Sequence, residues 1–407
     1  MILLKLFILF LIIFFQIFKK YNLSIIMGSA FFFLHLIFQT PLNIIYNNFL
    51  LTADNLKVYY LFIIVCSIIF LGNIMDKQGK INLIIDSLKI IFSDVRYLFI
   101  FFPAFIGLLP MPGGAMFTAP MLNKAGDELE MSNEKKVFFN YWFRHLWEYV
   151  WPLYPAFIIM RNLLGVSFIE IINSFYVYSL IAIFSGVFLL FALVKKKENS
   201  YSGDKLEAFK VILKNIWPVI FIITSIFAIN YNYKFSEEHF ILILFSLNIF
   251  LLFRSGLDNK DKKQLFLRSY TFQMFFLIVF IFLFKDAVNI IKIPEQLKLF
   301  VEHHNLSSTF LLFLIPFVSG MMTGITYGIV AISFPICMSF FIGAGGDIDL
   351  VKVAFCYACG FSGVLLSPLH LCLLMSNIYF DADLKKVYYY LIIPVGITLS
   401  YAFFTVL

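Results

Sequence analysis

The sequence predicts an all-α, polytopic membrane protein built from two inverted repeats, and its composition, apolar runs and duplicated Gly/Pro clusters support this class. Of the 407 residues, 61% are hydrophobic and 14% are charged. Soluble globular domains carry roughly 45–50% apolar and about 25% charged residues. At about 20 residues per crossing, the chain has room for roughly ten crossings with short loops. We therefore expect no separate soluble domain.

The crossings follow from apolar runs between charged segments. The first run begins near Lys5 and has no small-residue cleavage site before Lys19 and Lys20, so we expect an uncleaved first crossing. The expected crossings cover residues 2–18, 21–39, 56–75, 132–163, 170–194, 211–230, 239–254, 269–285, 348–379 and 386–407.

Two further apolar stretches, about 97–122 and 306–342, are each interrupted near the middle. The interruptions are PMPGG, from Pro110 to Gly114, and GMMTG, from Gly320 to Gly324. Helix breaks at bilayer depth are tolerated where the backbone is buried in protein or lines a cavity. We therefore expect two re-entrant hairpins, each entering and leaving on one side of the membrane.

The positions of Lys and Arg test this topology. If both hairpins return to the side they entered from, 22 of these residues lie on one side and 8 on the other, with Arg144 inside a crossing. Cytoplasmic loops collect Lys and Arg. The asymmetry predicts a multi-pass protein of a bacterial or archaeal inner membrane, with both termini outside and the 195–210 linker in the cytoplasm.

The two halves of the chain repeat the same order of features. FPAFIGLLPMPGG leads to WPLYPAF in the first half, and IPFVSGMMTG leads to SPLHLCL in the second. Pro103 aligns with Pro316 at a shift of 213 residues, and Pro152 aligns with Pro368 at a shift of 216. Because each unit has five crossings, an odd number, the second copy is expected to lie inverted.

The duplication predicts the domain boundaries. Each hairpin is preceded by an amphipathic segment, which we expect to lie along the membrane surface. The first repeat is 1–194, with surface segment 78–96, hairpin 97–122 and broken helix 132–163; the second is 211–407, with surface segment 286–305, hairpin 306–342 and broken helix 348–379.

Four helix breaks point to a central binding site. A broken helix presents free N–H groups at one end and free C=O groups at the other, each with roughly half an elementary charge. Paired breaks in two repeats are typical of a transporter's solute site, although small residues also serve close packing. The candidate residues near the breaks are Pro112, Gly113, Gly114, Thr118, Asn140, Thr323, Gly324, Thr326, Tyr327, Ser362, Ser367 and His370.

Arg144, His145 and Glu148 add ionisable groups to one crossing. Arg144 lies nine residues after Lys135, some 13 Å along a helix at 1.5 Å per residue, which places it near the midplane. Such groups usually face a cavity or a partner. Arg144 and Glu148 are spaced i and i+4, which permits an ion pair on one helix face; alternatively, Arg144 binds an anion while Glu148 and His145 carry a proton.

The five cysteines, all in apolar segments, predict packing rather than disulfides or a metal centre. Cys356 and Cys359 form a CxxC pattern, but no second cysteine pair accompanies it. We expect no cofactor, and we expect no nucleic-acid partner.

The motifs resemble one known family. The stretch from Gly107 to Met121, the WPxxP break and the SPLHLCLLMS segment are similar to the domain-of-unknown-function 401 family, and the resemblance covers nearly the whole chain. That family is grouped with the ion transporter superfamily of divalent-anion, citrate and gluconate carriers. The resemblance implies a scaffold domain, often a dimer interface, and a moving transport domain. The hairpin tips lack the Ser-Asn-Thr motif of dicarboxylate symporters.

These observations predict a homodimeric secondary transporter in the lipid bilayer, not an enzyme, that moves a small anionic solute with protons or sodium. One alternative is a channel or a lipid-handling protein. Another is an intramembrane serine hydrolase, because residues 360–363 read GFSG, as around the nucleophile of rhomboid proteases. No nucleotide-binding GxxxxGK[ST] loop is present, which argues against an ATP-driven pump.

Overall fold

The fold is all-helical, as the sequence predicts. The computed structural model describes residues 2–19, 21–109, 114–198, 203–232, 236–343 and 345–407. Within these ranges the regular elements are helices, and extended pairing is limited to isolated bridges between Asp94 and Glu198 and between Ile342 and Ile348.

Five segments are long and apolar enough to cross a membrane by length and composition. They are Leu56–Lys77, Phe168–Leu193, Lys205–Ile229, Asn259–Ile290 and Leu384–Val406. The other predicted crossings form apolar helices of 17 residues or fewer, or pairs of half-helices. The structure is therefore that of a membrane-compatible helical protein.

The first half of the chain contains eleven helical elements, one of which the sequence reading missed. The missed element is α3, which lies between two predicted crossings. The elements are α1 (Ile2–Phe18), α2 (Leu23–Phe38), α3 (Leu42–Ala53), α4 (Leu56–Lys77), α5 (Lys80–Ile91), α6 (Arg96–Gly107), α7 (Ala115–Glu128), α8 (Asn133–Arg144), the 3-10 helix η1 (Leu146–Tyr149), α9 (Pro155–Leu164) and α10 (Phe168–Leu193).

The second half follows the same order. A short helix again stands between its second and third long helices, as α3 does in the first half. The elements are α11 (Lys205–Asn232), α12 (Glu237–Phe253), α13 (Asn259–Ser269), α14 (Phe272–Ile290), α15 (Ile293–His303), α16 (Ser308–Thr323), α17 (Thr326–Phe341), α18 (Leu350–Leu365), α19 (Leu371–Phe380) and α20 (Leu384–Val406).

Local sequence explains several helix boundaries. Ser167 and Glu170 form a reciprocal capping box that starts α10. The Asp349 carboxylate accepts backbone hydrogen bonds from Val351 and Lys352 at the start of α18. Gly324 ends α16 with φ +64°, a left-handed conformation that glycine adopts without a side-chain clash.

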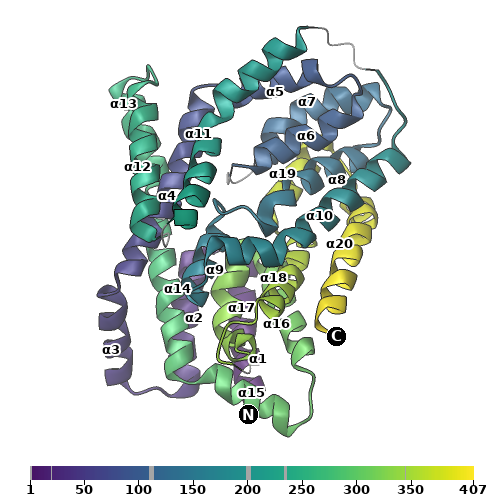
Figure 1. Cartoon of the computed structure of the whole chain (residues 1–407). Coiled ribbons are helices and arrows are strands. Elements are labelled where there is room, and N and C mark those ends of the chain that lie inside the picture. Colours follow the sequence, from purple (N-terminus) through teal and green to yellow (C-terminus); the bar gives the residue numbers. More distant parts are fainter. Residues whose placement is uncertain (1, 20, 110–113, 199–202, 233–235, 344) are drawn as a thin grey trace.

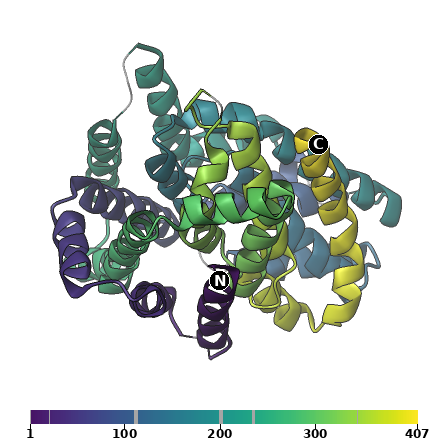
Figure 2. The same ribbon diagram turned by 90° about the horizontal axis from the view of Figure 1, so that it is seen from below.

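The two amphipathic helices lie at opposite ends of the molecule. Figure 1 shows α5 at the top with the arms α6 and α7 below it, and α15 at the bottom with α16 and α17 above it. Both chain termini lie toward the bottom, whereas the connection from α10 to α11 lies at the top. Figure 2 views the bottom end, where α1 begins and α20 ends.

Each hairpin packs tightly against the first half of a broken helix. A Cβ added to Gly107 would lie 2.2 Å from the backbone oxygen of Arg144, and one added to Gly320 would lie 2.0 Å from that of Gly360. Such distances leave no room for a side chain. Glycine therefore permits the close backbone contacts of α6 with α8 and of α16 with α18.

The second halves of the broken helices pack against the opposite hairpins. Helix α9 contacts α17, and α19 contacts α7 and α8. The two broken segments, 145–154 and 366–370, are thus enclosed by elements from both halves of the chain. This arrangement brings residues more than 200 positions apart to one buried region.

The second hairpin breaks at a different point from the one the sequence indicates. Helix α16 continues through Gly320 and ends at Thr323, and α17 begins at Thr326. Only Gly324 and Ile325 separate the two arms. Of the PMPGG interruption, Pro110–Gly113 lie outside the described residues, and Gly114 caps the start of α7.

Candidate functional site

The first break supplies backbone carbonyls that side chains from other helices satisfy. Helix α8 ends at Arg144, η1 follows, and Pro155 starts α9. The Ser179 hydroxyl donates to the carbonyl of Leu146 at 2.7 Å, and the Tyr357 hydroxyl donates to that of Glu148 at 2.8 Å. Because buried carbonyls need partners, these bonds stabilise an irregular backbone inside the molecule.

The second break is held in the same way. Tyr141 donates to the carbonyl of Leu365 at 3.2 Å, and Tyr388 donates to that of Leu366 at 3.1 Å. Tyr141 and Tyr357 are 216 residues apart, the shift that relates Pro152 to Pro368. Each tyrosine therefore lies on the first half of one broken helix and satisfies the break of the other.

Three aromatic side chains tie the first break to the end of α6. Trp147 donates to the carbonyl of Ala104 at 2.7 Å, and Trp151 donates to that of Leu108 at 2.9 Å. The Tyr154 hydroxyl donates to the carbonyl of Gly107 at 2.6 Å. These bonds fix the arm of the first hairpin against the broken segment.

Arg144 lies where the first hairpin meets the break. Its side chain is 3% exposed, and a Cβ on Gly114 would lie 2.5 Å from one of its terminal nitrogens. The guanidinium also hydrogen-bonds the side chain of Tyr154. A buried guanidinium is expensive to desolvate and marks a candidate anion site.

Glu148 faces the second hairpin. Its carboxylate lies 3.6 Å from Nε2 of His145 and hydrogen-bonds the side chain of Thr326, the first residue of α17. The predicted helix-face pairing of Arg144 with Glu148 is wrong as a geometry, because α8 ends at Arg144 and Glu148 lies in η1. Both side chains nevertheless contribute to one buried cluster, with an electrostatic interaction between them.

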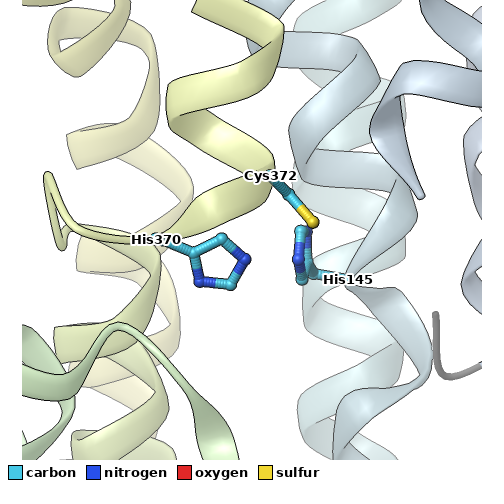
Figure 3. Close-up of side chains that lie close together, drawn as sticks. All are labelled: His145, His370 and Cys372. Atoms are coloured by element: carbon cyan, nitrogen blue, oxygen red, sulfur yellow. The ribbon is translucent and has the colours of Figure 1, made fainter. Parts of the chain in front are cut away.

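His145, His370 and Cys372 form a compact group at the two breaks. Each offers one potential metal-ligand atom, and these atoms lie within 4.8 Å of one another. The two imidazole rings are 4.7 Å apart and meet edge to face. Figure 3 shows His370 and Cys372 approaching from the second broken helix and His145 from the first.

A polar network lies beside this group. The Thr118 hydroxyl donates to the Asn140 side-chain oxygen at 2.5 Å. The Asn140 amide donates to the Ala115 carbonyl and to the Ser376 hydroxyl, both at 3.0 Å. Thr118, Asn140 and Ser376 are buried, so α7, α8 and α19 share a satisfied polar contact.

The structure joins some predicted site residues and assigns others to backbone support. Gly324 packs against the backbone of Leu369 and His370. Ser367 donates to the Met321 carbonyl at 2.6 Å, and Thr323 donates to that of Ser319 at 2.8 Å. These two hydroxyls therefore hold the second hairpin and its neighbouring break in place.

Three further candidates stand apart from this support. Thr323 lines a cavity of about 280 Å³ with Ile325, Leu369 and residues of α1 and α2. Ser362 donates within its own helix to Ala358 at 2.8 Å. Tyr327 lines a separate small space beside Pro155, and Pro112 and Gly113 lie outside the described residues.

The sequence reading missed the tyrosines and tryptophans that satisfy the breaks, and it assigned Cys372 to packing. A phenol on an apolar helix has no distinctive local pattern, since its acceptor is a carbonyl far away in the chain. The 216-residue relation between Tyr141 and Tyr357 is the one signal that points to these two.

The comparisons with known proteins identify a family. The chain matches the family described as "Protein of unknown function (DUF401)" over residues 2–407, and it belongs to that family. A search of curated proteins finds no match to the chain.

Proposed function

We propose that this family member is a secondary active transporter that moves a small, anionic solute across an inner membrane by alternating access. The observation that carries the proposal is the position of Arg144. Its buried guanidinium lies at the meeting point of a hairpin and a helix break, against Gly114 and Tyr154. A fixed positive charge enclosed by interrupted backbone suits an anion.

Corresponding contacts support the proposed inverted repeats. Gly107 against Arg144 and Gly320 against Gly360 are related by shifts of 213 and 216 residues, the two shifts found in the sequence. The opposite ends occupied by α5 and α15 agree with an inverted second copy (Figure 1). The proposed units are residues 1–194 and 211–407, joined by the 195–210 linker.

A second corresponding contact involves different chemistry in each half. Trp147 donates to the carbonyl of Ala104, and Gly363 packs against the carbonyl of Phe317, where an added Cβ would lie 2.1 Å away. These pairs obey the same two shifts. The duplicated backbone geometry is thus retained where the side chains have diverged, which supports two copies of one unit.

Alternating access requires the hairpins and broken helices to move together relative to the other helices. In the proposed carrier, α6–α9 and α16–α19 form the transport domain, and the remaining long helices form a scaffold and a homodimer interface. Glu148 and His145 are the proposed proton carriers, with sodium as the other candidate coupling ion. The lower end of Figure 1, where both termini lie, is the proposed outer side.

The test begins with a thermal-shift screen of purified protein against organic acids, inorganic oxyanions, sodium and pH. A ligand that binds the native form raises its apparent stability. Uptake of each hit is then measured in proteoliposomes for the unchanged protein, Arg144→Gln, Arg144→Lys and the matched control Arg268→Gln, whose side chain is exposed on α13.

Arg144→Gln is expected to abolish uptake while the Arg268→Gln control transports normally. Gel filtration and the melting temperature show whether each variant is folded, and Arg144→Lys keeps the charge if Gln is not tolerated. Normal uptake by a folded Arg144→Gln variant would remove Arg144 from the site and overturn the anion proposal.

A channel is the second candidate, because inverted repeats with hairpins also suit a continuous pore. Single-channel currents from reconstituted protein would favour a channel over a carrier. The hydrolase alternative rests on Ser362, whose hydroxyl donates within α18 while Gly363 packs against α16. These contacts explain the GFSG pattern by helix packing, and a serine-directed probe that labels Ser362 would contradict that explanation.

A further inference from the structure

Two buried imidazoles and a buried thiol converge at the helix breaks without the hydrogen bonds that such groups normally make. Nε2 of His145 and Nδ1 of His370 have no hydrogen-bond partner. The two imidazoles are 3% and 7% exposed, and Cys372 is 5% exposed. A buried polar atom without a partner is costly, so these ring nitrogens need an explanation.

The hydrogen bonding of His145 sets its tautomer. Nδ1 lies 2.7 Å from the carbonyl oxygen of Tyr141. Since a carbonyl only accepts, Nδ1 carries the proton and Nε2 presents its lone pair to the cluster. Metal-binding histidines are commonly oriented in this way, with one ring nitrogen on a backbone carbonyl and the other on the metal.

His370 is held similarly from the second hairpin. Its ring hydrogen-bonds the backbone of Gly324, and Nδ1 is the nitrogen left without a partner. His370 is also the residue that precedes α19, so the backbone fixes its position. The two imidazoles are therefore oriented by contacts on opposite sides of the cluster.

We propose that His145, His370 and Cys372 bind one zinc ion. Zinc prefers imidazole and thiolate ligands in tetrahedral geometry, with Zn–N of about 2.0–2.1 Å and Zn–S of about 2.3 Å. The ligand atoms, within 4.8 Å of one another, close by up to roughly 1 Å to reach the ~3.5 Å separations that such bonds require. Binding forms a Zn–S bond and releases the thiol proton to solvent.

The surrounding charges are compatible with this ion. The Glu148 carboxylate lies 3.6 Å from Nε2 of His145 and, with the Cys372 thiolate, offsets the positive charge of zinc. Arg144 opposes a cation, but it also stabilises the nearby thiolate, with which it has an electrostatic interaction. Three protein ligands leave a tetrahedral zinc one open position beside the proposed anion site.

The experiment uses the full-length purified protein and zinc alone, so it does not depend on transport. Equilibrium dialysis is expected to show one zinc per chain, with binding weakened roughly tenfold or more in His145→Gln, His370→Gln and Cys372→Ser. The matched controls are Cys66→Ser, at a buried cysteine on α4, and His304→Gln, at an exposed histidine. Both controls are expected to bind like the unchanged protein.

A second measurement needs no variant. X-ray absorption at the zinc edge of the loaded protein is expected to show one sulfur ligand at about 2.3 Å together with nitrogen or oxygen ligands at about 2.0–2.1 Å. Absence of saturable binding, absence of a sulfur ligand, or equal binding by the three cluster variants would each overturn the zinc site. Binding of Cu⁺ but not Zn²⁺ would overturn the choice of metal. Uptake by zinc-free protein distinguishes failure of this site from failure of the transport proposal.

Discussion

The Tyr357 hydroxyl donates a 2.8 Å hydrogen bond to the backbone carbonyl of Glu148, linking two broken helices from opposite halves of the chain. Both residues are buried. The bond satisfies a carbonyl that the end of α8 leaves outside any regular helix. The conformation of one break therefore depends on a side chain contributed by the other.

Tyr357→Phe is expected to lower the free energy of unfolding by about 1–3 kcal/mol, because it leaves a buried carbonyl without its partner. Thermal or denaturant unfolding in detergent measures the change. Tyr389→Phe is the matched control, since Tyr389 is 71% exposed. Equal stability of the two variants would show that the bond to Glu148 does not hold the break.

Gly107→Ala is expected to separate α6 from α8, because the new Cβ would lie 2.2 Å from the Arg144 carbonyl oxygen. Overpacking costs typically about 1–3 kcal/mol, so the melting temperature should fall. Gly396→Ala on α20 is the control, as its Cβ meets no heavy atom within 4 Å. An unchanged melting temperature for Gly107→Ala would contradict the close contact.

Asn140→Leu is expected to cost about 2 kcal/mol, since it removes the amide that joins Thr118, Ala115 and Ser376. A double-mutant cycle with Ser376→Ala should show a coupling of about 0.5–3 kcal/mol. The same cycle with Thr224→Val, at an exposed position on α11, should be additive within experimental error. Additivity in both cycles would rule out the predicted network.

The Asp94–Arg96 pair predicts an acid sensitivity outside the apolar helices. Burial raises the pKa of Asp94, but hydrogen bonds and the charge of Arg96 outweigh it, and the pKa lies below its ordinary value. A carboxyl with a lowered folded pKa contributes stability above its unfolded pKa, and this contribution is lost as the pH falls through the folded pKa. Asp94→Asn should therefore reduce stability near neutral pH and flatten its decline in acid.

Melting temperatures of the two proteins between pH 7 and pH 3 measure this difference. Arg96 also donates to the Val194 carbonyl at 3.3 Å, so the pair joins the start of the first hairpin to the end of α10. Asp86→Asn is the control, because Asp86 is paired with Lys89 on the exposed face of α5. Parallel pH curves for Asp94→Asn and the unchanged protein would contradict the assignment.

Much of the fold was predictable because its signals are local. Apolar runs gave the long helices, and the amphipathic segments before the hairpins became α5 and α15. The short α3 was missed, since its twelve residues mix apolar and amide side chains without a clear break from the preceding crossing. The break in the second hairpin was placed too broadly, because Gly320 serves helix packing and only Gly324 requires a left-handed conformation.

The candidate site was predictable only in part. Arg144, Glu148 and His370 were found because ionisable groups in apolar segments are exceptional, and the structure gathers all three around the breaks. Their partners were not found. The pairing of His145 with His370 and the approach of Cys372 depend on contacts across the chain, so no local pattern reveals them.

The sequence by itself determined the helical class, the positions of most helices and the duplicated order of their interruptions, because hydrophobic burial and proline or glycine chemistry act along short segments. The tertiary structure alone decided which buried groups meet, since a side chain on one broken helix finds its acceptor on the other, more than 200 residues away. Those contacts determine whether a buried arginine, carboxylate, thiol or imidazole supports the backbone or remains available to a ligand.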